Sequence, residues 1–383
     1  GHGGGGGGVR LSIVPANNQD PFSYSTLVVA TSTPARKAPH SSYVVQATVG
    51  SSSVSDPANA RNMTLMIDTG SDVTWARCGP GPGQTTCSGS PRVPCSSPLC
   101  DEVSERTKTA RRSCNETDVC EIELVYQDGD RVWVDVAQDS LAVGGVRLPT
   151  FTFGAADDSP MWSRTGGEER VHDDGILGLS RGGYGFPSLA RSRFGGVFSY
   201  CLPAFIRDNT GFLYLGGRGL FPGRGGCMPL NTDEGNEDDY MVDIESLRFG
   251  NVTDLRANHP MLIDSGTVVT HLEARLYAVL RQVVQATMAG LLTPAPQYPD
   301  DALDTCYLYP SHGGRGVPDG TLPLPEVAFR FAGGISFKLD DLFIRYDASR
   351  FCLAFRPTDY PYSILGNVHQ HHRVFTFDIV NDV

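Results

Sequence analysis

The stretch "MIDTGSDVTW", residues 66–75, places an acidic side chain directly after an apolar run. Asp68 ends this run, and three small residues follow it: Thr69, Gly70 and Ser71. A charge at the end of an apolar strand is costly to desolvate unless its surroundings are built for it. A strand that ends in an ordinary turn is the simple alternative, because Asp-Thr-Gly is also good turn chemistry.

The same unit occurs a second time. Residues 262–271 read "LIDSGTVVTH", in which Asp264 is followed by Ser265, Gly266 and Thr267. Each unit is followed, roughly 100 residues later, by an Ile-Leu-Gly unit, in "DGILGL" (174–179) and "YSILGN" (362–367). Two such pairs argue against chance turns. They predict a duplicated lobe with one aspartate from each half, and a boundary near the acidic stretch 231–239.

Two carboxyl groups held close together cannot both ionise easily, so the pair shares one proton over a range of acidic pH. The ionised member can take a proton from a water between them, and the protonated member can hydrogen-bond a carbonyl under attack. The neighbouring residues suit this role. Gly70 and Gly266 permit close approach of the backbone. Ser71 and Thr267 can each hydrogen-bond the aspartate of their own loop, and Thr69 and Ser265 can hold the two loops together.

Composition narrows the class of protein. The chain has 383 residues, of which 40% are hydrophobic, and its formal net charge is -12. This length suggests two domains or lobes. The acidic balance argues against a nucleic-acid partner, and no apolar run approaches the roughly 18 residues that a membrane span needs. Excess acidic charge also suits a protein that works in acid.

Most segments are short, rich in Val, Leu, Phe and Tyr, and broken by Gly or Pro, as in "SYVVQATVG" and "RVFTFDIV". This pattern predicts a fold of the all-β class, made mostly of strands with a few short helices. The clearest helix is "EARLYAVLRQVVQATMAG", where Leu276, Leu280 and Val284 recur at helical spacing and Gly290 ends the run. We expect residues 41–230 and 231–383 to form the two lobes.

Residues 1–40 are expected to be a prosegment remnant or a flexible segment, because they begin with a glycine run and are then rich in Ser, Thr, Pro and Ala. This start has neither Met nor an apolar signal region, so we expect a processed or trimmed chain. The ten cysteines lack the C-x2-C pairs typical of zinc sites. Disulfides in an oxidising compartment are the better interpretation. The sequons at Asn115 and Asn251 are glycosylation candidates.

On these motifs the chain resembles the pepsin-like aspartic proteases, and within them the plant nepenthesin-like branch. The motifs include "DTGSDVTW", "DGILGLSRG", "FSYCLP", "LIDSGT", "FCLAF" and "SILGNVHQHHRVFTFD". The resemblance implies a bilobal pepsin-like fold and an aspartic endopeptidase whose dyad is Asp68 and Asp264. It further implies peptide or protein substrates with apolar residues flanking the cut, inhibition by pepstatin-type compounds, no cofactor or metal, and a monomer.

The resemblance also implies a flap over the cleft. "CEIELVYQDGD" matches the family's hairpin, so Tyr126 would be the flap tyrosine and Trp75 would support it. Gln127 stands where the family usually has Gly. The family likewise implies a Cys306–Cys352 disulfide, whereas the pairing of the six cysteines between Cys78 and Cys120 stays open. We expect His369, His371 and His372 to alternate along a solvated strand rather than to bind a metal.

The main alternative is a catalytically inactive relative that inhibits glycosidases or binds another protein. Such relatives lose parts of the dyad or its hydroxyls, whereas here all of them are present. A dimeric retroviral-type protease is excluded, because both aspartates lie in one chain. The expected compartment is extracellular, in the apoplast, with vacuole or plastid as further possibilities.

Overall fold

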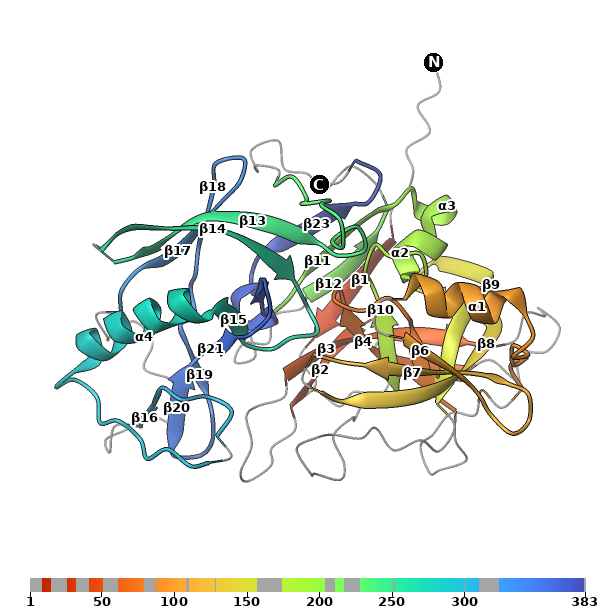
Figure 1. Ribbon diagram of the computed structural model, residues 1–383, viewed down its shortest axis with the longest axis horizontal. Helices are drawn as coiled ribbons and strands as arrows, with labels where there is room; N and C mark the ends of the chain where they lie inside the picture. The colour runs from red at the N-terminus through yellow and green to blue at the C-terminus, as the bar shows by residue number, and fades with distance from the viewer. Residues whose placement is uncertain are drawn as a thin grey trace, which may run out of the picture.

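The computed structural model describes residues 9–14, 26–31, 41–50, 61–78, 87, 89–107, 110–127, 129–156, 174–203, 211–216, 228–250, 252–299, 301–309 and 324–381. Strands dominate these residues, in agreement with the predicted all-β class. Figure 1 shows two halves: strands β3–β10 with α1 lie on one side, and strands β13–β18 with α4 lie on the other. Strands β1, β11, β12 and β23 lie between them.

The larger sheet has 13 strands, in the order β23-β11-β12-β1-β2-β3-β4-β10-β5-β9-β8-β7-β6. β3 also pairs with β8, so the sheet folds back on itself. Its strands are β1 (Val9–Val14), β2 (Thr26–Thr31), β3 (Ser41–Val49), β4 (Arg61–Asp68), β5 (Trp75–Arg77), β6 (Ala110–Cys114), β7 (Cys120–Val125), β8 (Arg131–Val143), β9 (Val146–Ala156), β10 (Gly175–Gly178), β11 (Val197–Cys201), β12 (Gly211–Leu215) and β23 (Val374–Asp378).

Two sheets belong to the C-terminal half. The first has seven strands, in the order β18-β17-β13-β14-β22-β15-β21: β13 (Met241–Phe249), β14 (Val252–Ile263), β15 (Thr270–Glu273), β17 (Val327–Phe331), β18 (Ile335–Lys338), β21 (Phe355–Thr358) and β22 (Ser363–Leu365). The second is formed by β16 (Cys306–Leu308), β20 (Arg350–Leu353) and β19 (Phe343–Arg345). The chain changes sheet between β12 and β13, where the lobe boundary near residues 231–239 is predicted.

Three strands depart from a simple division of the chain. β23, from the C-terminal end, pairs with β11 in the 13-stranded sheet, and Phe377 on it stacks on Phe198 with ring centroids 4.9 Å apart. β1 and β2 lie within residues 1–40, which were expected to be a prosegment remnant or a flexible segment, and both strands join the 13-stranded sheet. Their sequences, "VRLSIV" and "TLVVAT", are rich in β-branched and aliphatic residues, and β12 and β3 supply paired edges for them.

The helices are few and short. α1 (Pro98–Arg106) begins with Pro at its first position and is capped by Ser97, whose hydroxyl accepts from the Leu99 amide at 3.3 Å. α4 (Ala274–Met288) confirms the predicted helix and buries Leu276, Leu280 and Val284. α2 (Phe186–Leu189), α3 (Arg191–Phe194) and the 3-10 helix η3 (Asn367–His369) are single turns. Within the described residues, none of the helices is both long and apolar enough to cross a membrane.

Four disulfides join eight of the nine described cysteines. Cys78–Cys87, Cys95–Cys114 and Cys100–Cys120 tie the loop region before the β7–β8 hairpin. Cys306 and Cys352 lie directly opposite one another on β16 and β20 and form the bond that the family resemblance implied. Cys201 is not in a disulfide among the described residues, and Cys227 lies outside them. The six clustered cysteines thus form three local bonds, a pairing that their spacing left open.

The histidine run differs from its prediction as a solvated strand at His369 and His371, whereas His372 is exposed as predicted. His369 ends η3, is 2% exposed and lies 2.6 Å from the Thr270 hydroxyl through its Nδ1. His371 is 4% exposed, and its Nε2 lies 2.5 Å from the Tyr43 hydroxyl. Both rings are therefore buried, and His371 joins the two halves through Tyr43. Hydroxyl partners and the nearby ring of Phe355 make this burial possible, and burial lowers the pKa of His369 to about 3.

Candidate active site

The two aspartates occupy equivalent positions at the ends of two strands. Asp68 is the last residue of β4, and Asp264 directly follows β14. β4 runs parallel to β10, with Gly178 opposite Asp68, and β14 runs parallel to β22, with Ile263 opposite Leu365. Each Ile-Leu-Gly unit is thus the strand beside its own aspartate. This arrangement explains the spacing of the repeated motifs.

The loops that carry the aspartates interlock. The Thr69 hydroxyl donates to the Ile263 carbonyl at 2.8 Å, and the Ser265 hydroxyl donates to the Ile67 carbonyl at 3.0 Å. Each hydroxyl also accepts from the other loop, because the Ser265 amide lies 2.9 Å from Thr69 Oγ1 and the Thr69 amide lies 3.1 Å from Ser265 Oγ. Four bonds between buried groups therefore hold the loops in one register.

Each carboxylate receives a matching pair of donors. The Gly70 amide donates to Asp68 Oδ1 at 2.9 Å, and the Gly266 amide donates to Asp264 Oδ1 at 2.7 Å. The Ser71 hydroxyl donates to Asp68 Oδ2, and the Thr267 hydroxyl donates to Asp264 Oδ2 at 2.6 Å. Both aspartates are only 5% exposed. The donors orient the two carboxyl groups without neutralising either one.

The glycines at these loops are required by the closeness of the two halves. A Cβ atom on Gly266 would lie 2.4 Å from Asp68 Oδ1 and 2.5 Å from its Cγ. A Cβ atom on Gly70 would lie 2.9 Å from Asp264 Cγ. Each carboxyl group therefore rests against the backbone of the opposite loop. A side chain at either position would push the two carboxyl groups apart.

The electrostatics of the pair follow from this burial. Desolvation raises the pKa of Asp68 well above its usual range, and the negative charge of Asp264 raises it further. Hydrogen bonds from Ser71 and Gly70 lower the pKa of Asp68, but they do not overcome the first two effects. Two carboxyl groups in such contact keep one shared proton at pH values at which an isolated carboxyl group would already have lost its proton. This is the state that the predicted chemistry needs.

Three residues that the sequence did not single out support the backbone around Asp264. Gln370 is fully buried and donates through Nε2 to the Asp264 carbonyl at 2.9 Å and to the Leu365 carbonyl at 2.8 Å. Tyr200 donates its hydroxyl to Gln370 Oε1. The Asn367 amide side chain donates to the Ser265 carbonyl at 3.1 Å. Asn367 and Gln370 lie in "GNVHQHH", where the conspicuous histidines drew attention away from the amides.

The predicted flap is a hairpin of β7 and β8, and Tyr126 lies directly after β7. The Tyr126 amide donates to the Asp130 carbonyl at 2.8 Å, which closes the turn. Trp75 Nε1 donates to the Tyr126 hydroxyl at 2.6 Å, so the two residues named as flap and support are in direct contact. Trp75 is nearly fully buried, whereas Tyr126 is half-buried. The indole thus anchors the flap tyrosine through its hydroxyl.

We expect Tyr126→Ala to lower kcat/KM about 10- to 100-fold, because the lost ring no longer positions substrate. Tyr126→Phe should lose less, since it keeps the ring and removes the hydroxyl that accepts the bond from Trp75. Steady-state kinetics on one peptide, with the melting temperature of each variant as the control, would check this. Equal kcat/KM in wild-type and Tyr126→Ala protein would place Tyr126 away from the reacting atoms.

The tip of the flap reaches across to the other half. Gln127 Nε2 donates to the Tyr362 hydroxyl at 3.0 Å, and the Tyr360 hydroxyl donates to the Gln127 carbonyl at 3.0 Å. The two tyrosines belong to the segment between β21 and β22. Glycine, which the family usually has at this position, could accept the bond from Tyr360 through its carbonyl. The bond to Tyr362 needs the side chain of Gln127.

The two glycosylation candidates differ in what the structure describes. Asn115 is half-buried in the turn between β6 and β7, and its Oδ1 accepts from the Val119 amide at 2.9 Å. Asn251 lies outside the described residues, and glycosylation at both positions stays a prediction. Among the residues that the structure describes, no group of three or more His, Cys, Asp or Glu could hold a metal ion.

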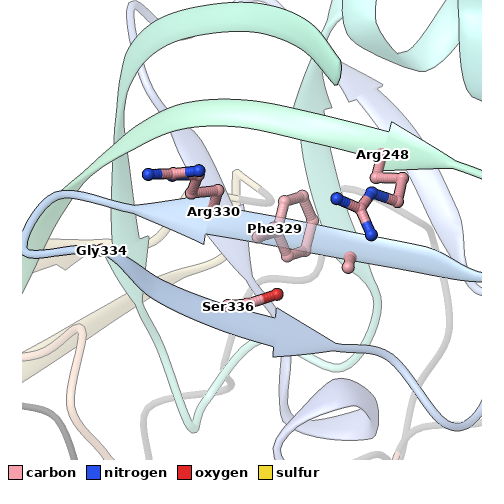
Figure 2. Close-up of a pocket in the computed structure, with 6 residues that line it drawn as sticks. Arg248, Phe329, Arg330, Gly334 and Ser336 are labelled. Carbon is pink, nitrogen blue, oxygen red and sulfur yellow. The ribbon is translucent and has the colours of Figure 1, made fainter. Parts of the chain in front are cut away.

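A small pocket lies on the outer face of the seven-stranded sheet, over β13, β17 and β18 (Figure 2). Arg248 and Arg330 are drawn on either side of Phe329, and Gly334 and Ser336 complete the wall. Both arginines are exposed, and Arg330 pairs with Glu245 at 3.2 Å. This pocket contains no acid or base of the dyad and is separate from the candidate site.

Two family models match most of the chain. The model described as "Xylanase inhibitor N-terminal" matches residues 43–217, and the one described as "Xylanase inhibitor C-terminal" matches residues 239–383. Among solved structures, basic 7S globulin from soybean is similar with a TM-score of 0.66 and 15% identity, covering 98% of this chain and 93% of the globulin. Conglutin gamma from lupine seeds has a TM-score of 0.67 and 15% identity, with 98% and 94% covered. These structures share the fold.

Curated relatives carry protease names. Aspartyl protease AED1 of Arabidopsis thaliana is 28% identical over 84% of this chain and 67% of its own length. Aspartyl protease 25 of Oryza sativa subsp. japonica is 27% identical, with 89% and 80% covered. Aspartic proteinase nepenthesin-1 of Nepenthes gracilis is 24% identical, with 85% and 74% covered. Together with the bilobal sheets and the paired aspartates, these matches show that the chain belongs to the plant family of pepsin-like aspartic proteases.

Proposed function

We propose that the protein is an aspartic endopeptidase that hydrolyses peptide bonds in acid, with a water activated between Asp68 and Asp264. The observation that carries this proposal is the complete dyad: two nearly buried carboxyl groups, each with its own amide and hydroxyl donor, on interlocked loops. The names of the curated relatives support the same general activity.

The proposed reaction uses one proton on the pair. The ionised carboxylate takes a proton from the water as its oxygen adds to the scissile carbonyl carbon, and the protonated carboxyl group hydrogen-bonds the carbonyl oxygen. The tetrahedral intermediate then collapses as its C–N bond breaks, and a carboxyl group gives a proton to the leaving nitrogen. The products are an acid and an amine, and the dyad returns to a singly protonated state. No covalent bond between enzyme and substrate forms.

The proposed substrate is an extended peptide with apolar residues flanking the cut. Tyr362 supports this choice, because this partly buried aromatic side chain lies near enough to Asp264 to feel its charge. Burial raises the pKa of Tyr362 to about 12, with further contributions from the charges of Asp239, Tyr360 and Asp264. The hydroxyl of Tyr362 is thus uncharged at every pH relevant to the reaction and can accept or donate a hydrogen bond.

A catalytically inactive relative is the second candidate, because the matching family models are described as xylanase inhibitors. The decisive experiment is digestion of a denatured protein at acid pH, with and without pepstatin. Peptide products that pepstatin suppresses would support the endopeptidase. Intact substrate at every acid pH tested, together with inhibition of a xylanase by the protein, would support the alternative.

We expect a bell-shaped dependence of kcat/KM on pH with a maximum at about pH 3 to 5, since model carboxyl groups titrate near 4 and proximity separates the two values. Below the lower pKa both groups are protonated, and no base remains for the water. Above the raised pKa both are ionised, and no acid remains for the carbonyl; activity is therefore lost as pH rises. A maximum at pH 7 or above, or activity blocked by a chelator, would contradict this mechanism.

We also propose an oxidising compartment, with secretion to the apoplast as the first choice. Four disulfides among the described cysteines support it. Mass spectrometry under non-reducing conditions should find at most two free thiols in the ten cysteines. If most of them were alkylated without reduction, this assignment would have to be given up.

A further inference from the structure

The flap and the C-terminal half are joined through three side chains. Gln127, at the tip of the β7–β8 hairpin, donates through Nε2 to the Tyr362 hydroxyl at 3.0 Å. The Tyr360 hydroxyl donates to the main-chain carbonyl of Gln127 at 3.0 Å. The rings of Tyr360 and Tyr362 stack on each other, with centroids 5.6 Å apart and planes 14° apart. One residue of the hairpin is thus held by both members of a stacked pair.

These contacts span the cleft rather than close a local turn. Gln127 lies 233 residues from Tyr360 and 235 from Tyr362 in sequence. The hairpin belongs to the 13-stranded sheet, which also contains β4, the strand that ends at Asp68. Tyr362 directly precedes β22, which pairs with β14, the strand that leads to Asp264. The contacts therefore connect the half that carries Asp68 with the half that carries Asp264.

The two ends of the connection differ in rigidity. Tyr362 packs against a buried cluster of Met241, Leu262 and Ile364, and this packing restrains its ring. The Tyr360 amide donates to the Thr358 hydroxyl at 3.1 Å, which fixes the start of the segment. Gln127, in contrast, lies at a hairpin tip and its contacts are exposed to solvent. Hydrogen bonds in this setting are of modest strength and can open and close.

We propose that Gln127, Tyr360 and Tyr362 form a clasp that holds the flap closed across the cleft in the free enzyme. The assignment of the cleft rests on the proposed function. A long peptide has to pass under the hairpin to reach the dyad, so the clasp opens before such a peptide enters. When it closes again, it keeps Tyr126, the neighbour of Gln127, at its position on Trp75. All three are positioning residues, because they act on the reaction through the flap.

The double variant Tyr360→Phe with Tyr362→Phe tests the clasp. It removes both hydroxyl groups and keeps the stacked rings and the buried packing of Tyr362. We expect amide hydrogen exchange in residues 121–135 to accelerate about 10-fold, the scale of two lost hydrogen bonds. The association rate constant of pepstatin should rise by a similar factor, because the open flap becomes more populated. The melting temperature should stay within a few degrees of wild type.

Two further variants sharpen the result. Gln127→Ala keeps the carbonyl that Tyr360 bonds but removes the bond to Tyr362, so it should give a smaller acceleration than the double variant. Tyr298→Phe is the matched control, because it removes a hydroxyl from an exposed tyrosine outside the clasp. It should leave the exchange of the flap unchanged.

Unchanged exchange of the flap in the double variant would overturn the clasp, as would an acceleration spread evenly over the whole chain. This readout does not depend on catalysis. If the wild-type protein neither hydrolysed peptides nor bound pepstatin, the proposed function would fail, and the exchange of residues 121–135 would still decide whether the clasp exists.

Discussion

Asp68→Asn and Asp264→Asn should each lower kcat/KM by about 1,000-fold or more, because the dyad acts as a unit and either change removes the shared proton. In each variant the side chain keeps the size of the carboxyl group and one oxygen, which can accept from one of the two donors, while its NH2 group can donate to the neighbouring hydroxyl. What it loses is the ability to accept a proton from water. Peptide cleavage measured at the wild-type optimum would test this, and retention of more than a few per cent of activity would contradict the dyad.

The fold should survive these substitutions. Burial raises the pKa of Asp68 above its unfolded value, so the native state holds the proton more tightly than the unfolded chain. The contribution of Asp68 to the free energy of unfolding is therefore fully present below the unfolded pKa, near 3.8, and is lost as pH rises through the raised pKa. Asn has no proton to lose. The melting temperature of Asp68→Asn at neutral pH should be equal to or higher than that of the wild type.

Asp174→Asn is a matched control for both variants. Asp174 is a half-buried carboxylate that precedes β10, and its Oδ2 accepts from the Thr64 amide at 2.7 Å. Asn at this position keeps an acceptor and removes one negative charge outside the dyad. Its activity should stay within a few-fold of the wild type. A loss as large as that of Asp68→Asn would mean that charge in general, and not the dyad, was being measured.

Gly266→Ala should give the second-largest loss of activity, about 100-fold or more in kcat/KM, since a misplacement of about 1 Å in a catalytic group can have that effect. The new Cβ would lie 2.4 Å from Asp68 Oδ1, a distance at which the carboxyl group or the loop has to move. Either movement separates the two aspartates. The pH profile should change with the rate, because carboxyl groups that are farther apart have pKa values closer together.

The chain offers a graded series for this test. A Cβ atom on Gly70 would lie 2.9 Å from Asp264 Cγ, a less severe contact, so Gly70→Ala should lose less activity than Gly266→Ala. Gly89 has no heavy atom within 4 Å of the added Cβ, so Gly89→Ala should match the wild type. An order of activity other than Gly89→Ala above Gly70→Ala above Gly266→Ala would refute the argument from close contact.

The local pattern of the sequence was sufficient for several features. Each apolar run that ends in Asp-hydroxyl-Gly-hydroxyl is a strand followed by a loop, and the structure brings the two loops together. The apolar spacing of Leu276, Leu280 and Val284 placed α4 correctly. Short segments such as "SYVVQATVG" are strands because alternating apolar residues cover one face of a sheet. These features depend on residues that are close to one another in the sequence.

Other features depend on partners that only folding supplies. The histidines were expected on a solvated strand, but His371 is buried against Tyr43, 328 residues away. Gln370 gained its role because Asp264 and Tyr200 lie around it. β1 and β2 became strands because β12 and β3 offered paired edges, and β23 returned to the sheet of the other half.

The sequence by itself therefore determined the two aspartate loops and the strand-rich class, because hydrophobic periodicity and loop chemistry are properties of adjacent residues. The tertiary structure alone decided the pairing of the six clustered cysteines, the burial of His369 and His371, and the contact of Gln127 with Tyr360 and Tyr362. A hydrogen bond or a disulfide needs its two atoms within a few ångströms of each other. For partners up to 328 residues apart, that distance is set by the packing of whole sheets, which no local pattern encodes.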